Sequence, residues 1–150
     1  YLYSAEDYAW WSQQLGRELA PGTFGENLTL SAYEDQPLRV GDQFIINDVI
    51  LEATAPRIPC DKLAARMGEP SFVKRFADAK RPGVYIRVLQ EGTVRAGDTV
   101  RYIPADPNNL TIIELQDLFL AKDKDEALMR KALDAPVAER ARAALEEWLA

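Results

Sequence analysis

The stretch Pro56-Arg-Ile-Pro-Cys-Asp-Lys-Leu63 contains Cys60, the one cysteine of a 150-residue chain that has no histidine. A strand-like apolar run precedes this stretch and a helical pattern follows it. Its two prolines end regular strand pairing and stiffen the approach to the thiol, because proline lacks an amide donor. Helix-end amides and nearby cations, here Arg57 and Lys62, favour the thiolate. Cys60 is therefore the residue suited to soft-metal or sulfur chemistry, and the alternative is a buried cysteine that acts as a small hydrophobe.

The absence of histidine removes whole classes of chemistry. Ser-His-Asp triads, Cys-His pairs and histidine-based zinc sites are excluded, and one cysteine does not supply a Cys-rich zinc or iron–sulfur site. The sequence contains neither a Walker phosphate loop nor a dinucleotide glycine fingerprint. Carboxylate pairs such as Glu34-Asp35 lie in turn-like segments and are expected to be solvated.

The charge is unevenly distributed along the chain. The net charge is −6, which argues against a nucleic-acid partner, since phosphate contacts require a basic surface. Residues 1–56 carry two basic and nine acidic residues, whereas residues 57–81 carry seven basic and three acidic residues, a local charge of +4. An acidic protein with one basic segment is suited to a small anion, and the alternative is a solvated charged face.

Short apolar runs separated by glycine turns predict a mixed α/β, mainly β, fold built around a small barrel, with flanking helices. We assign residues 1–104 to this barrel and residues 105–150 to a three-helix C-terminal appendage, because the composition changes at the turn-rich segment between them. Strands are expected over 28–30, 44–46, 49–53, 84–89 (of the buried type) and 100–103. Helices are expected from the Ser4 capping box to Leu15, over 61–67, from about Pro70 through Phe76, from the Thr111 capping box to Leu120, over 126–133 after an Asp123 cap, and over 137–149.

The remaining features concern the cellular setting. The N-terminus has no basic region followed by an apolar region, so no signal peptide is predicted. No apolar run approaches the roughly 18 residues that a membrane span requires. A single cysteine forms no internal disulfide, so we expect a cytoplasmic protein with no membrane and no nucleic-acid partner.

At these motifs the chain resembles the MOSC family, named after the C-terminal domain of molybdenum cofactor sulfurases, and especially its YiiM-like branch. The resemblance lies in Gly-Thr-Phe-Gly-Glu-Asn-Leu (residues 22–28), in Pro-Arg-Ile-Pro-Cys-Asp-Lys-Leu (residues 56–63) and in Arg-Pro-Gly-Val-Tyr-Ile-Arg-Val-Leu (residues 81–89). Residues 108–150 are similar to the three-helix appendage of that branch. The resemblance implies a MOSC-type β-barrel with flanking helices.

The resemblance also implies a site. In the family a cysteine at the position of Cys60 ligates the molybdenum of a pterin cofactor or carries a persulfide, and the YiiM-like branch is associated with the reduction of N-hydroxylated compounds, including base analogues. The implied partners are an electron-donor protein and a small N-hydroxylated substrate. The residues expected to contact cofactor phosphate or oxo groups, or to line the site, are Arg57, Lys62, Arg81, Glu26, Asn27 and Gly25.

Two alternatives remain open. Family members carry further strands upstream, with a His-Gly-Gly stretch, and this sequence starts after that point, so the barrel is expected to be incomplete. The chain could then be a persulfide sulfur carrier or transferase, which needs no bound metal. It could instead be a non-catalytic module that completes its barrel by forming a homodimer.

Overall fold

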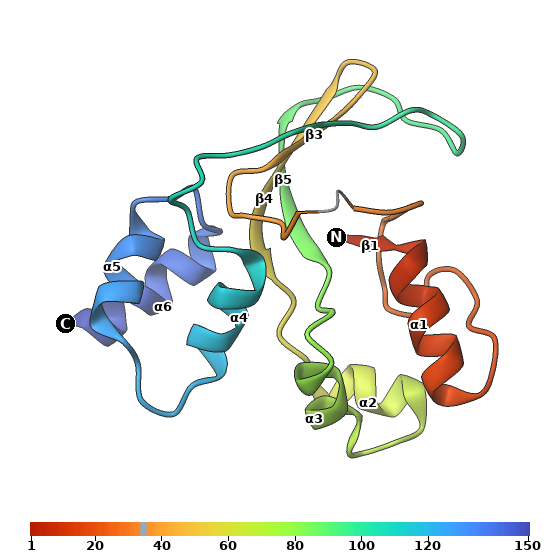
Figure 1. Cartoon of the computed structure of the whole chain (residues 1–150), viewed down its shortest axis with the longest axis horizontal. Coiled ribbons are helices and arrows are strands. Elements are labelled where there is room, and N and C mark those ends of the chain that lie inside the picture. The colour runs from red at the N-terminus through yellow and green to blue at the C-terminus, as the bar shows by residue number, and fades with distance from the viewer. Residues whose placement is uncertain (34–35) are drawn as a thin grey trace. The chain divides into compact units, whose positions relative to one another are not determined.

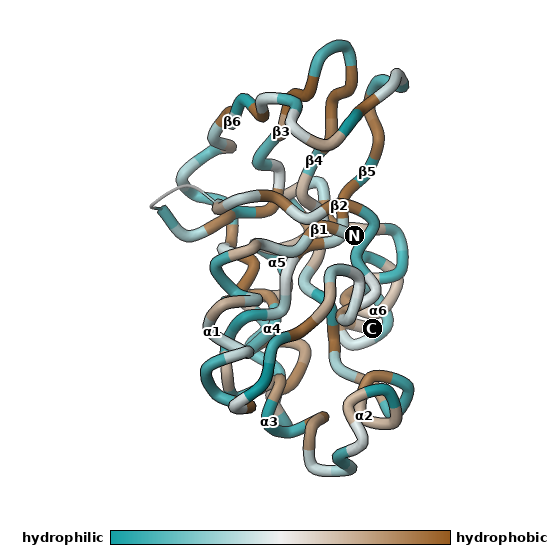
Figure 2. The backbone as a smooth tube through the Cα atoms, turned by 90° about the vertical axis from the view of Figure 1, so that its right-hand side faces the viewer, coloured by the Kyte–Doolittle hydropathy of each residue, from teal (hydrophilic) through white to brown (hydrophobic). Residues whose placement is uncertain are grey.

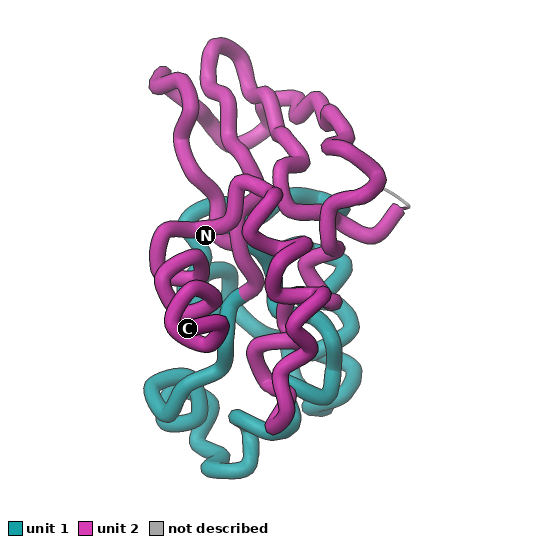
Figure 3. The backbone as a smooth tube through the Cα atoms, turned by 90° about the vertical axis from the view of Figure 1, so that its left-hand side faces the viewer, with its two compact units in different colours: residues 1–33, 57–84 teal, residues 34–56, 85–150 magenta. Residues whose placement is uncertain are grey.

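The computed structural model describes residues 1–33 and 36–150, which form two compact units (Figures 1 and 3). Unit 1 contains residues 1–33 and 57–84, and unit 2 contains the described part of residues 34–56 together with residues 85–150. The Glu34-Asp35 pair lies outside the described residues. Each unit is built from two separated chain segments, and the domain boundary expected after residue 104 stays a prediction.

Unit 1 combines short strands with three helices. Strand β1 pairs in parallel with β2 and pairs antiparallel, through Leu2, with Val84, the residue at which β5 begins. The elements of this unit are β1 (Leu2–Ser4), α1 (Ala5–Leu15), β2 (Leu28–Leu30), α2 (Asp61–Met67), α3 (Phe72–Asp78) and the start of β5 (Val84–Gln90).

The helix signals of unit 1 are mostly confirmed. The Ser4 side chain accepts a hydrogen bond from the Asp7 amide at 3.0 Å and caps α1, which ends at Gly16 in the left-handed conformation. Helix α2 has the expected bounds and also ends at a left-handed glycine, Gly68. The placement of Pro70 inside the next helix is wrong, because Pro70 lies in the turn that precedes α3.

The core of unit 1 is aromatic. Trp11 lies 5.0 Å from the ring of Phe72 and stacks at 6.0 Å on Phe76, while Phe24 stacks on Tyr3 at 4.6 Å. The apolar face predicted for α1 and α3 is thus buried, together with Phe24 of the glycine-containing loop. Burial of several aromatic side chains is a large share of what stabilises so small a unit.

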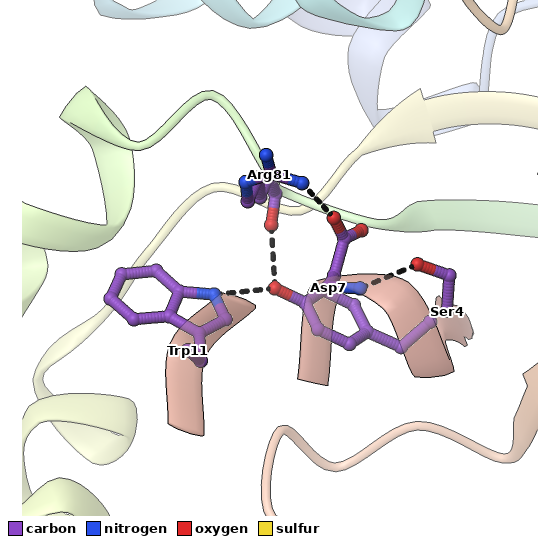
Figure 4. A network of polar contacts seen from close by, with 5 residues as sticks. Ser4, Asp7, Trp11 and Arg81 are labelled. Carbon is purple, nitrogen blue, oxygen red and sulfur yellow. Dashed lines mark hydrogen bonds and ion pairs between the residues drawn. The ribbon is translucent and has the colours of Figure 1, made fainter. Parts of the chain in front are cut away.

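A polar network joins the two segments of unit 1 (Figure 4). The Tyr3 hydroxyl donates a hydrogen bond to the Arg81 carbonyl at 2.8 Å and accepts one from Trp11 Nε1 at 2.9 Å. The Arg81 guanidinium pairs with Asp7 at 2.6 Å. It also lies 4.6 Å from the Trp10 ring. All of the polar groups in this network therefore have partners, which is the condition for burying them at small cost.

Unit 2 contains the longer strands. The strands of this unit, with the part of β5 that follows Val84 as the first of them, are hydrogen-bonded in the order β5-β4-β3-β6. Strand β3 pairs antiparallel with both β4 and β6. The β3–β4 hairpin turns at Asn47, which has a φ of 55° and so uses the tolerance of asparagine for the left-handed region. The strands are β3 (Gln43–Ile46), β4 (Val49–Pro56) and β6 (Arg101–Ile103), and the helices are α4 (Ile112–Leu120), α5 (Glu126–Leu133) and α6 (Glu139–Leu149).

Two helix starts in unit 2 differ from the sequence prediction. The capping box of α4 is confirmed, but the cap of α5 is Asp125 and not Asp123, because it is the Asp125 carboxylate that accepts from the Leu128 amide. Helix α6 begins at Glu139 and not at Val137, since Val137 donates its amide to the Ala135 carbonyl in a turn. Helix α4 packs on β4, and α5 packs against α6. Within the described residues no helix is both long and apolar enough to cross a membrane.

Two turns of unit 2 share the sequence Arg-x-Gly-Asp and the same geometry. In each the aspartate side chain accepts from the arginine amide at 2.8 Å, and the glycine has a φ near 95° (Gly41) or 93° (Gly97). Asp42 is fully buried and accepts two further hydrogen bonds, from Tyr102 at 2.8 Å and from the Ala105 amide at 2.7 Å. The first turn thus anchors the entry to β3 and the linker before α4.

The expectation of a buried β5 is wrong. Val84 is fully buried, but Tyr85, Val88 and Leu89 are 44%, 51% and 47% exposed. A continuous apolar run is typical of a strand covered on both faces. Here β1 is three residues long and its pairing with β5 is at Val84, so this apolar stretch, drawn largely in brown in Figure 2, is surface within the described residues.

Replacing Gly83 by alanine should strongly destabilise unit 1. Gly83 has a φ of +66°, and a Cβ there would lie 2.6 Å from Tyr3 Cδ2 and 2.7 Å from the Leu2 carbonyl oxygen. We expect Gly83→Ala to lower the free energy of unfolding by roughly 3 kcal/mol or more, measured by urea denaturation. The control is Gly97→Ala, at a φ of +93° with no atom near the added Cβ, for which only about 1 kcal/mol of backbone strain is expected. Equal losses in the two variants would contradict the importance of this close approach.

Replacing Gln116 by methionine should stabilise the protein. Gln116 on α4 is fully buried, and neither its Nε2 nor its Oε1 has a hydrogen-bond partner among the described residues. A buried amide without partners costs roughly 1–3 kcal/mol, and methionine has a similar volume without that penalty. We expect the thermal midpoint to rise in Gln116→Met and to stay within a degree or two in Gln13→Met, an exposed control on α1. A lower midpoint in Gln116→Met would show that the amide is satisfied in solution.

Candidate functional site

Cys60 is the solvent-exposed residue at the start of α2. Its backbone is extended, with a φ of −140° and a ψ of 167°, and its carbonyl accepts hydrogen bonds from the amides of Leu63 and Ala64, which begin the helix. Leu63 and Ala64 are buried in the aromatic core, so the helix start is fixed while the thiol faces solvent. The interpretation of Cys60 as a small buried hydrophobe is therefore wrong.

The surroundings of Cys60 favour its thiolate. The thiol makes no capping hydrogen bond to α2, but the N–H of Leu63, and then those of Lys62 and the Arg57 guanidinium, hold the pKa of Cys60 below its ordinary value. The small degree of burial acts in the opposite direction and does not outweigh them. A lowered thiol pKa on an exposed side chain is the property of a reactive or metal-ligating cysteine.

Arg57 connects the cysteine segment to the glycine-containing loop. Its Nη1 donates a hydrogen bond to the Phe24 carbonyl, and its guanidinium lies 5.4 Å from the Tyr1 ring and 6.0 Å from the Phe76 ring. A Cβ at Gly25 would lie 4.0 Å from the same Nη1, so the loop backbone passes close to the guanidinium. The structure thus brings Arg57 and the loop backbone at Phe24 and Gly25 together.

Glu26 holds the loop from within. Its carboxylate accepts hydrogen bonds from the Tyr8 hydroxyl at 2.7 and 2.9 Å, from the Gly22 amide at 2.9 Å and from the Thr29 hydroxyl at 2.8 Å. Burial alone would raise the pKa of Glu26, but these hydrogen bonds together lower it. Burial of Tyr8, and then its hydrogen bond to Glu26, raise the pKa of Tyr8 to about 12. The loop therefore closes around the Glu26 carboxylate. The sequence indicated Tyr8 only as a core residue, and its helical spacing did not predict that its hydroxyl binds Glu26.

The other expected site residues have different surroundings. Asn27 accepts a hydrogen bond from the Tyr1 amino group at 2.7 Å, and Arg81 is engaged with Asp7 and Trp10 as described above. Lys62 and Arg66 are exposed, one turn apart on α2, and neither makes an ion pair or side-chain hydrogen bond within the described part of the chain. Lys62 is thus the cation nearest to Cys60 in sequence that is free to meet an anion.

The side chains around Cys60 fit a metal whose other ligands are supplied by an organic cofactor. Residues 1–33 and 36–150 contain no cluster of three or more histidine, cysteine, aspartate or glutamate side chains that could hold a metal ion. An exposed, thiolate-prone cysteine supplies one soft ligand, and the adjacent cations Arg57 and Lys62 suit an anionic organic group. This arrangement is compatible with a molybdenum–pterin cofactor, in which the organic group supplies further ligands.

Comparison with known proteins assigns the family. The profile described as the MOSC domain matches residues 1–101. The chain belongs to the MOSC domain family. Among solved structures, YiiM from Geobacillus stearothermophilus is similar, with a TM-score of 0.88 and 27% sequence identity, and the match covers 99% of this chain and 77% of that one. The predicted family, the similarity to YiiM proteins and the mixed α/β fold class are therefore confirmed.

Curated relatives extend beyond the part that this MOSC chain matches. The uncharacterized protein YflK of Bacillus subtilis is 32% identical over 111 residues, which are 74% of this chain and 50% of YflK. A Gibberella moniliformis protein named Reductase is 29% identical over 119 residues, which are 79% of this chain and 21% of that protein. The chain thus spans half or less of the length of these two relatives.

Glu26 should make the stability of the protein depend on pH. Because its pKa is lowered on folding, its contribution is complete above the unfolded value near 4.5 and is lost as the pH falls through the lower folded value. We expect Glu26→Gln to be less stable than the wild type at pH 7, and this difference in unfolding free energy to shrink between about pH 5 and pH 3. Urea unfolding at a series of pH values measures this difference. The control for loss of charge is Glu18→Gln, since Glu18 is an exposed carboxylate of the same unit. A difference that stays constant with pH would argue that the Glu26 contacts do not depend on its charge.

Proposed function

We propose that this MOSC domain binds a molybdenum–pterin cofactor through Cys60 and takes part in the reduction of N-hydroxylated compounds, base analogues among them. The observation that carries the proposal is the exposed Cys60 thiol with a lowered pKa, beside Arg57 and Lys62, in a chain of this family. A relative named Reductase is consistent with redox chemistry. The reducing cytoplasm expected from the single cysteine would keep the thiol available.

In this proposal the chain's own residues hold the cofactor and fix its orientation. Cys60 provides the soft ligand, Lys62 contacts the anionic part of the cofactor, and the backbone of the loop at Gly25 permits close approach. Arg81, engaged with Asp7, contributes positive charge from a fixed position. Bound molybdenum would supply two-electron redox chemistry toward an N–O bond. The electrons would come from a donor protein, and the substrate would be a small N-hydroxylated compound.

Two other functions keep specific support. The exposure of the Cys60 thiol also suits a persulfide carrier, whose sulfur has to be reached by a donor and an acceptor. The exposed apolar residues of β5 suit a module that self-associates as a homodimer. In the first case the thiol would carry a labile sulfur and no metal, and in the second it would be dispensable.

Metal and pterin content test the main proposal. We expect the protein purified from a cofactor-producing host to contain near-stoichiometric molybdenum, by mass spectrometry of the metal, and a matching amount of pterin. Cys60→Ala should lose at least nine tenths of both, while Ser71→Ala, which changes an exposed residue of the same unit, should keep them.

The outcomes separate the three functions. Molybdenum absent from the wild type and from Cys60→Ala would reject the proposal. Sulfur on Cys60 that dithiothreitol removes, seen as the mass of one sulfur atom, would then select the persulfide carrier. An unmodified thiol in a stable dimer would select the self-associating module.

A further inference from the structure

Exposure alternates along the segment that leads to Cys60. Ile58 and Cys60 are exposed, whereas Arg57 and Pro59 are half-buried. Such alternation is typical of an extended segment that presents every second side chain to one side, and the Cys60 backbone is extended. The aliphatic side chain of Ile58, 39% exposed, is therefore presented to solvent two residues from the thiol. Neither the core of unit 1 nor the proposed cofactor site uses it.

Helix α2, which follows this segment, carries two exposed positive charges. Lys62 and Arg66 lie four residues apart, so they share one face of the helix. Leu63 and Ala64 are buried in the core of unit 1, which fixes the direction of the exposed face. Asp61 is the one acidic residue of the helix, so two positive charges and one negative charge leave α2 with a net charge of +1. Like charges at this spacing disfavour a helix, and an acidic partner would remove that repulsion.

The cations of the neighbouring helix α3 are paired within the protein. Lys74 forms an ion pair with Asp78, and Arg75 pairs with Glu69 at 3.3 Å. Arg75 also donates a hydrogen bond to the Gln14 carbonyl at 3.1 Å. The two cations of α2 make no such pair within the described part of the chain. Of the cations on α2 and α3, those of α2 are therefore the ones open to an external carboxylate.

The rest of the chain is mostly acidic. Residues 1–56 carry two basic and nine acidic residues, and the whole chain has a net charge of −6. An approaching acidic protein is therefore repelled by most of the chain and attracted by residues 57–81, whose local charge is +4. Such a pattern orients the partner during the encounter, because it penalises other directions of approach. The segment that attracts the partner also contains Cys60.

The proposed reaction favours a small, short-lived contact with an electron donor. Reduction of an N–OH group to N–H takes up two electrons and two protons and releases water, so a one-electron carrier has to bind and leave twice in each cycle. Electron-transfer complexes use interfaces at the small end of the size range, and an interface has an apolar centre and a polar rim. Ile58 supplies an exposed apolar contact, and Lys62 and Arg66 supply rim charges of one sign.

We propose that Ile58, Lys62 and Arg66 form a docking face on which an acidic electron-donor protein binds next to Cys60. The proposal rests on the proposed function in taking the partner to be an electron donor. It assigns a role to Ile58 and Arg66, which have none in cofactor binding, whereas Lys62 is shared between the cofactor and the donor. The tests use the metal-free protein. Docking without molybdenum content would reject the proposed function alone, and molybdenum content without docking would reject the docking face alone.

The first test measures binding to two acidic one-electron carriers, a plant-type ferredoxin and a flavodoxin, by titration calorimetry at low salt. We expect saturable binding to the wild type, which becomes about 5-fold or more weaker in Arg66→Glu and about 2-fold or more weaker in Ile58→Ser. Binding to the wild type should also weaken as salt is added, because exposed charges are screened.

The control for this test changes the same charge elsewhere. Arg140 is exposed on α6 of unit 2, and Arg140→Glu alters the net charge by as much as Arg66→Glu does. It should change binding by less than about 2-fold, since the attraction is local. No saturable binding of either carrier to the wild type, or equal losses in Arg66→Glu and Arg140→Glu, would overturn the docking face. An unchanged affinity in Ile58→Ser would remove Ile58 from it.

The second test needs no substitution and so does not depend on whether a variant folds. A carbodiimide joins a lysine amine to a carboxylate of the bound carrier as an amide and is itself converted to a urea. We expect peptide mass spectrometry to find Lys62 joined to the carrier several-fold more often than Lys74, which is also exposed but paired with Asp78. Equal yields at Lys62 and Lys74, or cross-links mainly at Lys122 or Lys131 of unit 2, would overturn the proposal.

Discussion

The close approach of Gly83 to Tyr3 is the constraint on which unit 1 depends. Only a residue without a side chain permits the Arg81–Val84 segment to pass so near the ring of Tyr3, and the left-handed backbone of Gly83 directs the chain into its pairing with Leu2. That approach places the Arg81 carbonyl on the Tyr3 hydroxyl and the Arg81 guanidinium on Asp7. The aromatic core that supports both Cys60 and the loop then closes around these contacts.

Charge in the site is divided between fixed and free groups. Arg57 and Arg81 have protein partners, and Glu26 is satisfied inside its own loop, so these three charges organise the backbone. Lys62 and Arg66 have no such partners within residues 1–33 and 36–150 and remain hydrated. A site built in this way keeps a positive potential near the thiol while its partly buried charges are already paired within the protein.

Much of this arrangement could be predicted from the sequence because its signals are local. The Ser4 and Thr111 caps, the glycine that ends α2 and the position of Cys60 at the start of that helix follow from rules that span a few residues. The hydrogen bonds of Tyr8 and Arg57 were not predicted, because their partners lie 18 and 33 residues away and a ring at helical spacing indicates only a buried face. The exposure of β5 was not predicted for a related reason. An apolar run is typical of a covered strand, but the run itself does not show whether another element of the structure covers it.

The division of unit 1 into two chain segments has a consequence during synthesis. The hydrogen bond between Tyr3 and Arg81 spans 78 residues, and closing such a loop costs roughly 4 kcal/mol of chain entropy beyond a constant. While the ribosome adds residues 34–56, the aromatic side chains of α1 have no Phe72 or Phe76 to pack against. The apolar face of α1 therefore stays exposed on the nascent chain until α3 and Gly83 have emerged from the exit tunnel. A chaperone that binds unfolded chains would be of most use during this interval.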